Sequence, residues 1–190
     1  MSKIIIGLLG KQGSGKGYFT EVLQVLLPGQ VVRIRSGGIL VDLLKMLNLP
    51  NTRQNLQKMV NCLKDNFGGN IISESVYARI LSTEGDIIIF DAVRWKSDEE
   101  MVRRFKDGRI VYIDTEKDIR YQRLKDRGEK EDEKSLGRDK FEKAELDSTE
   151  IDIPDIGSRA DVVITNNGTE DEFIDKVRDF CAKYIWRRPI

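Results

Sequence analysis

The sequence predicts an α/β fold of three layers, in which a five-stranded parallel sheet lies between two layers of helices. Two observations lead to this prediction. Apolar runs of strand length alternate with longer segments of helical periodicity along the 190 residues, and such alternation is typical of a parallel sheet whose strands are connected by helices. Two of the apolar runs are almost entirely Ile and Leu, as expected for strands that helices cover on both faces.

Five runs are predicted strands because each is short, apolar and bounded by polar or turn residues. They are residues 3–9, 31–35, 86–91, 109–114 and 161–165. Helical spacing of apolar residues predicts helices at 15–27, 51–67, 97–106, 116–127 and 169–184. Pro28 and Gly29 end the first of these helices, and Asn51 and Thr52 are the expected caps of the second.

The length suits one domain, residues 1–190, with a complete hydrophobic core. No internal repeat or change of composition marks a second domain. A helical insertion at 37–81 and a very polar one at 128–159 interrupt the alternation. A charged segment of this kind is commonly a solvated surface. Because the polar insertion directly follows three arginines, it is also a candidate for the mobile part of a site, and both interpretations stay open.

The composition excludes several classes of function. The 32 basic and 32 acidic residues balance, so we expect no nucleic-acid binding through broad electrostatics. No signal peptide and no run long enough to span a bilayer is present, which predicts a cytoplasmic protein without a membrane partner.

The two cysteines have neither disulfide nor metal spacing. The chain has no histidine, and phosphoryl transfer fits this absence because it depends mainly on positioning and charge neutralisation.

The strongest motif is GKQGSGKG, which follows the first predicted strand and leads into a helix. In this context backbone N–H groups and the helix dipole favour an anion. The motif matches G-x-x-x-x-G-K, but a glycine stands where a hydroxyl residue is usual, and we expect this small residue to allow close approach of phosphate. Lys16 would reach the outer phosphates. The residues predicted to bind the nucleotide are Gly10, Gln12, Gly13, Ser14, Gly15, Lys16, Gly17 and Tyr18.

A second motif, DIIIFDAVRW, places a carboxylate at the carboxyl end of a central strand. Asp91 is the expected partner of Mg²⁺, through water, since it would lie beside the phosphate-binding loop. Arg94, three residues later, could contact a second phosphate. The alternative is an ordinary strand end followed by a surface arginine.

Two further motifs lie in the C-terminal half of the chain. Arg120, Arg123 and Arg127 share one helix face, which predicts a lid over a triphosphate at 120–159, unless neighbouring aspartates neutralise them. Arg138 is a further candidate within the polar insertion. In VVITNNGT, Asn167 and Gly168 follow the last strand, where they could pack against a purine, and Thr169 would cap the last helix; simple turn chemistry is the alternative.

With these motifs in order, the chain resembles the nucleoside monophosphate kinase superfamily, of the P-loop NTPase type. It is similar to adenylate kinase-related and dephospho-CoA kinase-like proteins and to phage deoxynucleoside monophosphate kinases. The resemblance rests on the segments GKQGSGKG, TRQNLQKMVNCLKDNFG, DAVRWKSDEEM, RYQRLKDRG and ADVVITNNGTEDEF and spans nearly the whole chain. Two positions depart from it, because Tyr18 stands where the group places Thr and Gly38 where relatives often carry an acidic residue.

The resemblance implies ATP and Mg²⁺ as cofactors, an acceptor-binding insertion at 37–81 and a lid at 120–159. It implies that the ion is held mostly through phosphates and water, since Tyr18 replaces the usual Thr. The catalytic residues implied are Lys16, Asp91, Arg94, Arg123 and Arg127. The implied acceptor-binding residues are Arg35, Arg53, Gln57, Arg94 and Arg138.

The predicted function is transfer of the γ-phosphoryl group of ATP to a small acceptor, foremost a (deoxy)nucleoside monophosphate. A phosphate acceptor needs no general base, in agreement with the missing histidine. One alternative is a dephospho-CoA kinase, in which Asp91 would double as the base for a ribose hydroxyl. Another is a non-catalytic, nucleotide-binding regulator, which the departures at Tyr18 and Gly38 favour. The sequence leaves the base and sugar of the acceptor and the oligomeric state open.

Overall fold

A computed structural model of the chain describes residues 3–127, 137–147 and 150–186, without the side chains of residues 53, 92 and 127. Its centre is one parallel sheet of five strands in the order β2-β3-β1-β4-β5, which confirms the predicted fold class. The strands are β1 (Ile4–Leu9), β2 (Val31–Ile34), β3 (Ile87–Val93), β4 (Gly108–Asp114) and β5 (Val162–Thr165).

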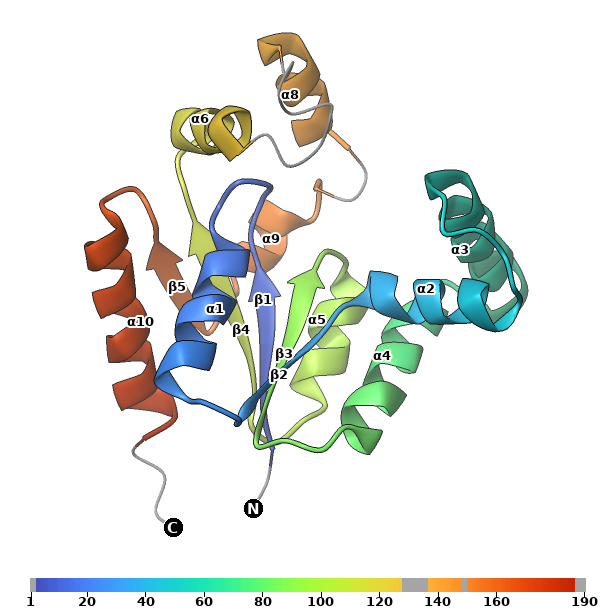
Figure 1. Cartoon of the computed structure of the whole chain (residues 1–190), viewed down its shortest axis with the longest axis horizontal. Coiled ribbons are helices and arrows are strands. Elements are labelled where there is room, and N and C mark those ends of the chain that lie inside the picture. The colour runs from blue at the N-terminus through green and yellow to red at the C-terminus, as the bar shows by residue number, and fades with distance from the viewer. Residues whose placement is uncertain (1–2, 128–136, 148–149, 187–190) are drawn as a thin grey trace.

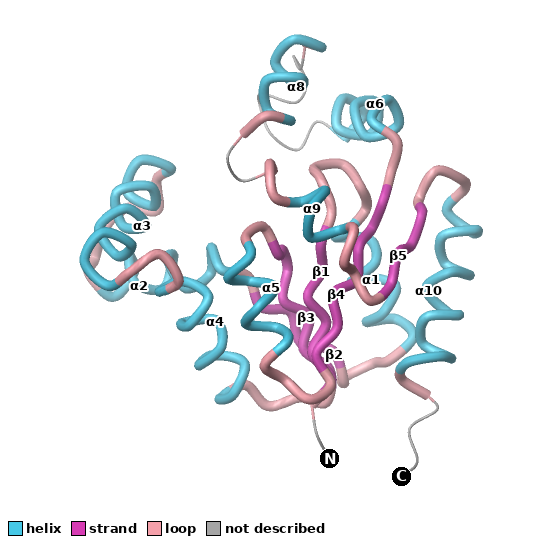
Figure 2. Tube along the Cα trace, turned by 180° about the vertical axis from the view of Figure 1, so that it is seen from behind, coloured by secondary structure: helices cyan, strands magenta, loops and turns pink. Residues whose placement is uncertain are grey.

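Helices cover both faces of this sheet (Figures 1 and 2). The helices are α1 (Lys16–Leu26), α2 (Ser36–Met46), α3 (Arg53–Phe67), α4 (Ile71–Ser82), α5 (Lys96–Arg103), α6 (Lys117–Arg127), α8 (Arg138–Glu145), α9 (Ile153–Gly157) and α10 (Glu170–Tyr184). One face carries α1 and α10, and the other carries α4, α5 and α9. The predicted caps are present, because the hydroxyls of Thr52 and Thr169 accept main-chain N–H bonds at the starts of α3 and α10.

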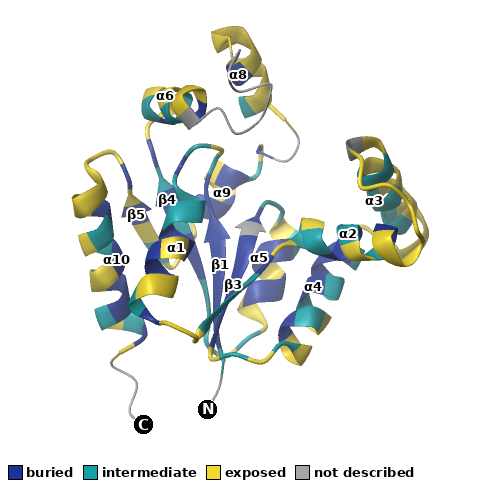
Figure 3. Ribbon diagram, in the orientation of Figure 1, coloured by how far each residue is buried: buried dark blue, intermediate teal, exposed yellow. Residues whose placement is uncertain are grey.

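The central strand β1 shows why the sheet is buried on both sides. Its side chains alternate between two hydrophobic clusters. Ile4, Ile6 and Leu8 pack in the cluster with α1 and α10, whereas Ile5 and Leu9 pack in the cluster with α4 and α5. All six residues of the strand are buried, and Figure 3 shows the same for the middle of the sheet. The continuous apolar runs in the sequence follow directly from this two-sided burial.

Two predicted boundaries were wrong by a few residues. Strand β3 continues past Asp91 to Val93, and the pairing with β1 shifts there, since Leu8 faces Asp91 and Leu9 faces Val93. The extra residue forms a bulge of the kind that re-aims side chains near sites. Helix α5 ends at Arg103 and not at 106, because the chain then tightens into i→i+3 turns.

The carboxyl ends of the parallel strands lie at one edge, so the loops that carry the predicted motifs converge there. Helices α6 and α8 lie above this edge, and the helical insertion α2–α4 lies to one side, with α3 farthest from the sheet (Figure 1). None of the described helices is both long and apolar enough to cross a membrane.

The substitution Phe90→Ala should destabilise the fold strongly. The Phe90 side chain is fully buried in the central strand β3, and removing such a ring typically lowers the free energy of unfolding by about 3–5 kcal/mol. Val25→Ala is the matched control, since Val25 is 80% exposed, and its effect should stay within about 0.5 kcal/mol. Urea unfolding measures both values, and equal effects of the two substitutions would contradict the assigned core.

Candidate functional site

A cavity of about 780 Å³ opens at the carboxyl edge of the sheet. It lies between the loop after β1, the ends of β2 and β3, and helix α6. Its lining includes many of the predicted site residues, namely Gln12, Gly13, Ser14, Gly15, Lys16, Gly17, Tyr18, Arg35, Asp91, Arg94 and Arg123. The same cavity is also lined by four residues that no sequence motif predicts, namely Glu21, Arg33, Gly37 and Leu124.

The main-chain carbonyls of the loop after β1 are bonded by side chains from other elements. The carbonyl of Ser14 accepts hydrogen bonds from Thr115 Oγ1 at 3.0 Å and Asn166 Nδ2 at 2.9 Å. The carbonyl of Gln12 accepts one from Arg120 Nη1 at 3.4 Å. Because these carbonyls are held by protein donors, the loop can present its N–H groups to an anion.

Glycine is required at Gly15 for two reasons. Its φ of +98° lies in the left-handed region, and a Cβ there would clash with Nδ2 of Asn166, which bonds the loop. Gly17 differs, because it lies in the first turn of α1, and a Cβ at this position would meet no protein atom within 4 Å. Packing within the protein therefore does not require glycine at this position. A ligand that lies close to the Cα of Gly17 would require it.

The ammonium of Lys16 closes the loop, since it donates to the carbonyls of Gly10 and Lys11. Burial lowers the pKa of Lys16 to about 8. The carboxylates of Asp91 and Glu150 act in the opposite direction on this pKa, and the guanidinium groups of Arg94 and Arg120 lower it further. An anionic ligand beside the ammonium would raise the pKa again.

The hydroxyl groups of α1 are committed to protein partners. Tyr18 donates to the carboxylate of Glu170 on α10, and its ring stacks on Phe173 with 5.9 Å between the ring centroids. The buried hydroxyl of Thr20 donates to the carbonyl of Lys16 at 3.2 Å. Tyr18 thus lines the cavity while its hydroxyl is directed to the last helix.

Asp91 is nearly buried, at 8% exposed, and is bonded by two arginines of β2 and its C-terminal end. Arg33 donates from both Nε and Nη2 to Oδ2 of Asp91, and Arg35 donates to the same oxygen at 3.3 Å. No sequence motif predicted Arg33 in the site. The alternation in VVRIRS could have predicted it, because it places residues 33 and 35 on one face of a strand.

Arg94 also lies beside a carboxylate that the sequence analysis did not single out. Its Nη1 donates to Glu150 at 2.8 Å, and its main-chain N–H donates to Asp98 at 3.0 Å. Glu150 is only 3% exposed. It lies in the very polar insertion, where no sequence feature separates a buried acid from a solvated one.

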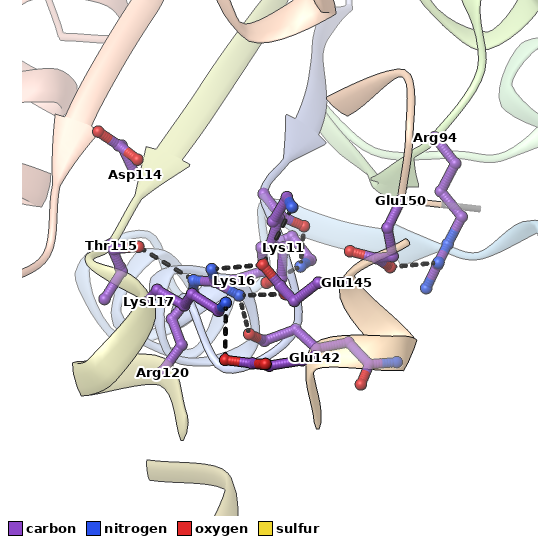
Figure 4. A network of polar contacts seen from close by, with 12 residues as sticks. Lys11, Lys16, Arg94, Asp114, Thr115, Lys117, Arg120, Glu142, Glu145 and Glu150 are labelled. Atoms are coloured by element: carbon purple, nitrogen blue, oxygen red, sulfur yellow. Dashed lines mark hydrogen bonds and ion pairs between the residues drawn. The ribbon is translucent and has the colours of Figure 1, made fainter. Parts of the chain in front are cut away.

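The three arginines of the predicted lid have different environments. Arg120 is buried and forms a bidentate ion pair with Glu145 of α8, at 2.6 and 2.8 Å, and Glu145 also bonds Lys11 (Figure 4). The expectation that Arg120 lies over a triphosphate is therefore corrected, because it connects the loop to α8. The predicted Arg127 side chain lies outside the described residues.

Arg123 differs from Arg120 because it has no carboxylate partner among the residues that the structure describes. Its Nη2 donates to Asn166 Oδ1 at 3.3 Å, while its Nη1 is buried without a hydrogen-bond partner there. Burial alone lowers its pKa. The guanidinium lines the cavity, so it is available to a negatively charged ligand.

Two predicted acceptor residues do not line the cavity. Gln57 is exposed on α3 and donates to Asn61 at 3.1 Å. Arg138, also exposed, forms ion pairs with Asp118 and Glu142. The side chain of Arg53 lies outside the described residues. Roles for these three residues in acceptor binding stay predictions.

The loop after β5 contacts the site through a residue other than the two predicted. Asn166 is buried and joins Ser14 to Arg123. Asn167 instead bonds Glu116, with its Oδ1 accepting the main-chain N–H at 2.9 Å. Asn167 and Gly168 are exposed at the surface beside this contact, and their role toward a base stays a prediction.

Comparison with known proteins agrees with this architecture. A family model described as an AAA domain matches residues 6–147. A UPF0200 protein of Pyrococcus horikoshii is 28% identical over 196 residues, which cover 98% of this chain and all of the relative. A UPF0200 protein of Methanoregula boonei is 27% identical and covers 92% of this chain and 94% of the relative.

Solved structures show the same fold at low sequence identity. A shikimate kinase from Bacteroides thetaiotaomicron has a TM-score of 0.63 and 13% identity, and covers 94% of this chain and 98% of its own. A shikimate kinase from Acinetobacter baumannii, in complex with shikimate, has a TM-score of 0.58 and 16% identity over 97% and 96% of the two chains. A gluconokinase from Sinorhizobium meliloti has a TM-score of 0.56 and 13% identity over 96% and 93%. The chain thus has a P-loop kinase-like fold.

The substitution Gly17→Ala should separate ligand binding from folding. Since a Cβ at this position would meet no atom within 4 Å beyond its chain neighbours and the adjacent turn of its own helix, we expect the free energy of unfolding to stay unchanged or to rise by up to about 1 kcal/mol. The Kd for ADP should rise about tenfold if phosphate approaches the Cα closely. Gly15→Ala is the comparison, and it should lower the free energy of unfolding by about 1–3 kcal/mol. Unchanged ADP binding in Gly17→Ala would refute a ligand close to the Cα of Gly17.

Polyphosphate binding should weaken above about pH 8. The pKa of Lys16 is about 8 in the free protein and higher beside phosphate, so binding takes up a proton between these two pKa values. We expect the Kd for ADP to rise by up to about tenfold per pH unit in that range. Calorimetry in two buffers of different ionisation heat measures the proton uptake. In the control Lys16→Arg the cation stays charged, so its Kd should not vary over this range. A pH-independent Kd of the unmodified protein would contradict the assignment.

Proposed function

Because the chain belongs to the AAA domain family and has a P-loop kinase-like fold, we propose that it is an ATP-dependent phosphotransferase. Its acceptor in this proposal is a small anion, with a (deoxy)nucleoside monophosphate as the first candidate. One observation carries the proposal. The carbonyls of Gln12 and Ser14 are bonded by residues that do not line the cavity, and the same loop lines the cavity together with Arg123, an arginine without a carboxylate partner in the described part of the chain.

The donor side of the cavity suits the phosphates of ATP. Loop N–H groups, the N-terminus of α1 and the Lys16 ammonium supply positive potential on one side. Arg123 supplies it from α6. In phosphoryl transfer negative charge spreads over the transferred group, and fixed cations lower its energy without reorganisation. In this proposal Lys16 and Arg123 have this role.

The residues at the site fit Mg²⁺ bound together with a nucleotide. Asp91 reaches the cavity from β3, and its Oδ2 is bonded by the two β2 arginines. In the described residues no group of three or more acidic, His or Cys side chains forms a metal cluster of its own. Such a site suits Mg²⁺, which commonly uses one or two carboxylates, substrate phosphates and water. When bound, the ion would neutralise charge on the outer phosphates.

The acceptor side favours an anion. Arg33, Arg35 and Arg94 line the cavity around Asp91. Guanidinium groups bind phosphate or carboxylate through paired hydrogen bonds. Oδ2 of Asp91 already accepts hydrogen bonds from Arg33 and Arg35, so this oxygen is engaged by protein donors and not by an acceptor hydroxyl. The arrangement therefore favours a phosphate acceptor, which needs no base, over the hydroxyl of dephospho-CoA.

The activity can be tested by ADP release from Mg-ATP in the presence of single acceptors. The panel contains ribo- and deoxynucleoside monophosphates and dephospho-CoA, together with shikimate and gluconate because of the structural neighbours. We expect turnover with one or more monophosphates. Lys16→Ala should lower kcat about 100-fold or more, since it removes a cation that contacts the transferred group.

Two outcomes would contradict parts of the proposal. Turnover with dephospho-CoA alone would assign a hydroxyl acceptor and reject the phosphate acceptor. Binding of ATP without turnover of any acceptor would favour the non-catalytic regulator, and absence of ATP binding would reject the nucleotide site itself.

A further inference from the structure

Glu150 is a buried acid at the transfer site that no motif identifies. It follows α8 in the chain, and its side chain is only 4% exposed. One carboxylate oxygen accepts from Arg94 Nη1 at 2.8 Å. The other oxygen is buried and has no hydrogen-bond partner within residues 3–127, 137–147 and 150–186. Figure 4 shows the Glu150–Arg94 pair apart from the Glu145–Arg120 pair.

A gain in the free energy of unfolding does not explain why this carboxylate is buried. A buried ion pair loses much of its attraction to desolvation, and a partly unsatisfied carboxylate loses more. Two cations of the site interact with Glu150 in the described part of the chain: Arg94 bonds it, and its charge raises the pKa of Lys16. The acid is thus in contact with a side chain that lines the cavity.

Arg94 is held at both ends. Its main-chain N–H and that of Trp95 donate to the carboxylate of Asp98, at 3.0 and 3.2 Å. Asp98 is buried at the start of α5 and also accepts from Ser73. This contact fixes the main chain just after β3. The guanidinium is held separately, by Glu150 from the segment that follows α8.

We propose that Glu150 is a positioning residue that holds the guanidinium of Arg94 at the acceptor side of the cavity. The segment after α8 thereby completes the acceptor subsite. Glu150 does not itself line the cavity, so it acts through Arg94 and not on the reacting atoms. The kinetic consequence rests on the proposed phosphotransferase activity, whereas the order of the Arg94 side chain does not.

The kinetic test compares Glu150→Gln and Glu150→Ala with the control Asp175→Asn. Asp175 is an exposed acid of α10 that pairs with the exposed Arg178. We expect the acceptor KM to rise about 3–10-fold in Glu150→Gln and about 10–100-fold in Glu150→Ala, because a charged hydrogen bond that orients a substrate-binding group is weakened or lost. The KM for ATP should stay within about twofold, and Asp175→Asn should change neither value by more than about twofold. Equal rises of both KM values in Glu150→Gln would overturn the proposal.

A second measurement decides the proposal without turnover. The {¹H}-¹⁵N NOE of the Arg94 Nε–H group, assigned by comparison with Arg94→Lys, reports the order of this side chain. It should be high in the unmodified protein and in Asp175→Asn, and lower in Glu150→Gln and Glu150→Ala, with thermal unfolding showing that each variant is folded. If Arg94 stays equally ordered in both Glu150 variants, the positioning role is refuted. If no acceptor is phosphorylated, the proposed function fails, while this NOE still decides the role of Glu150.

Discussion

The candidate site depends on hydrogen bonds that other segments of the chain donate to the loop after β1. Thr115 after β4, Asn166 after β5 and Arg120 of α6 all donate to carbonyls of this one loop. A peptide whose C=O is bonded away from a cavity turns its N–H toward that cavity, and several such peptides make an anion-binding surface. The loop is thus built by three other segments of the chain, and the parallel sheet is what brings their ends to the same edge.

Several arginines lie at the same edge of the sheet, and the protein partners of each guanidinium determine whether it can bind a ligand. Arg120 is fully engaged by Glu145 and serves the loop and α8. Arg33 is engaged by Asp91 and faces the cavity. Arg123 meets an amide but no carboxylate in the described residues. A partly buried guanidinium without an anionic partner raises the free energy of the folded protein. A polyphosphate bound between the loop after β1 and Arg123 would offset that cost.

The candidate site was predictable where a local pattern had a physical meaning. The glycines and Lys16 follow the end of β1, and Asp91 and Arg94 lie at the carboxyl end of β3. Their convergence at one edge could therefore be expected, and the structure places Lys16, Asp91 and Arg94 around one cavity. Glu145 and Glu150 could not be predicted, because they lie in a segment of uniformly high charge. Their burial depends on which helix packs over them. Arg33 was detectable from strand alternation, but only once its strand lay beside β3.

The sequence by itself determined the order of strands and helices, the two-sided burial of the sheet and the glycine-rich turn at the first strand end, because periodicity, turn chemistry and strand length are local properties. Only the tertiary structure decided which charged side chains are neutralised by protein and which are left for a ligand. That distinction separates Arg120 from Arg123, three residues apart on one helix. It depends on contacts between separate segments, such as Arg120 with Glu145 and Arg123 with Asn166, which are 25 and 43 residues apart, and no local pattern encodes the distance between them.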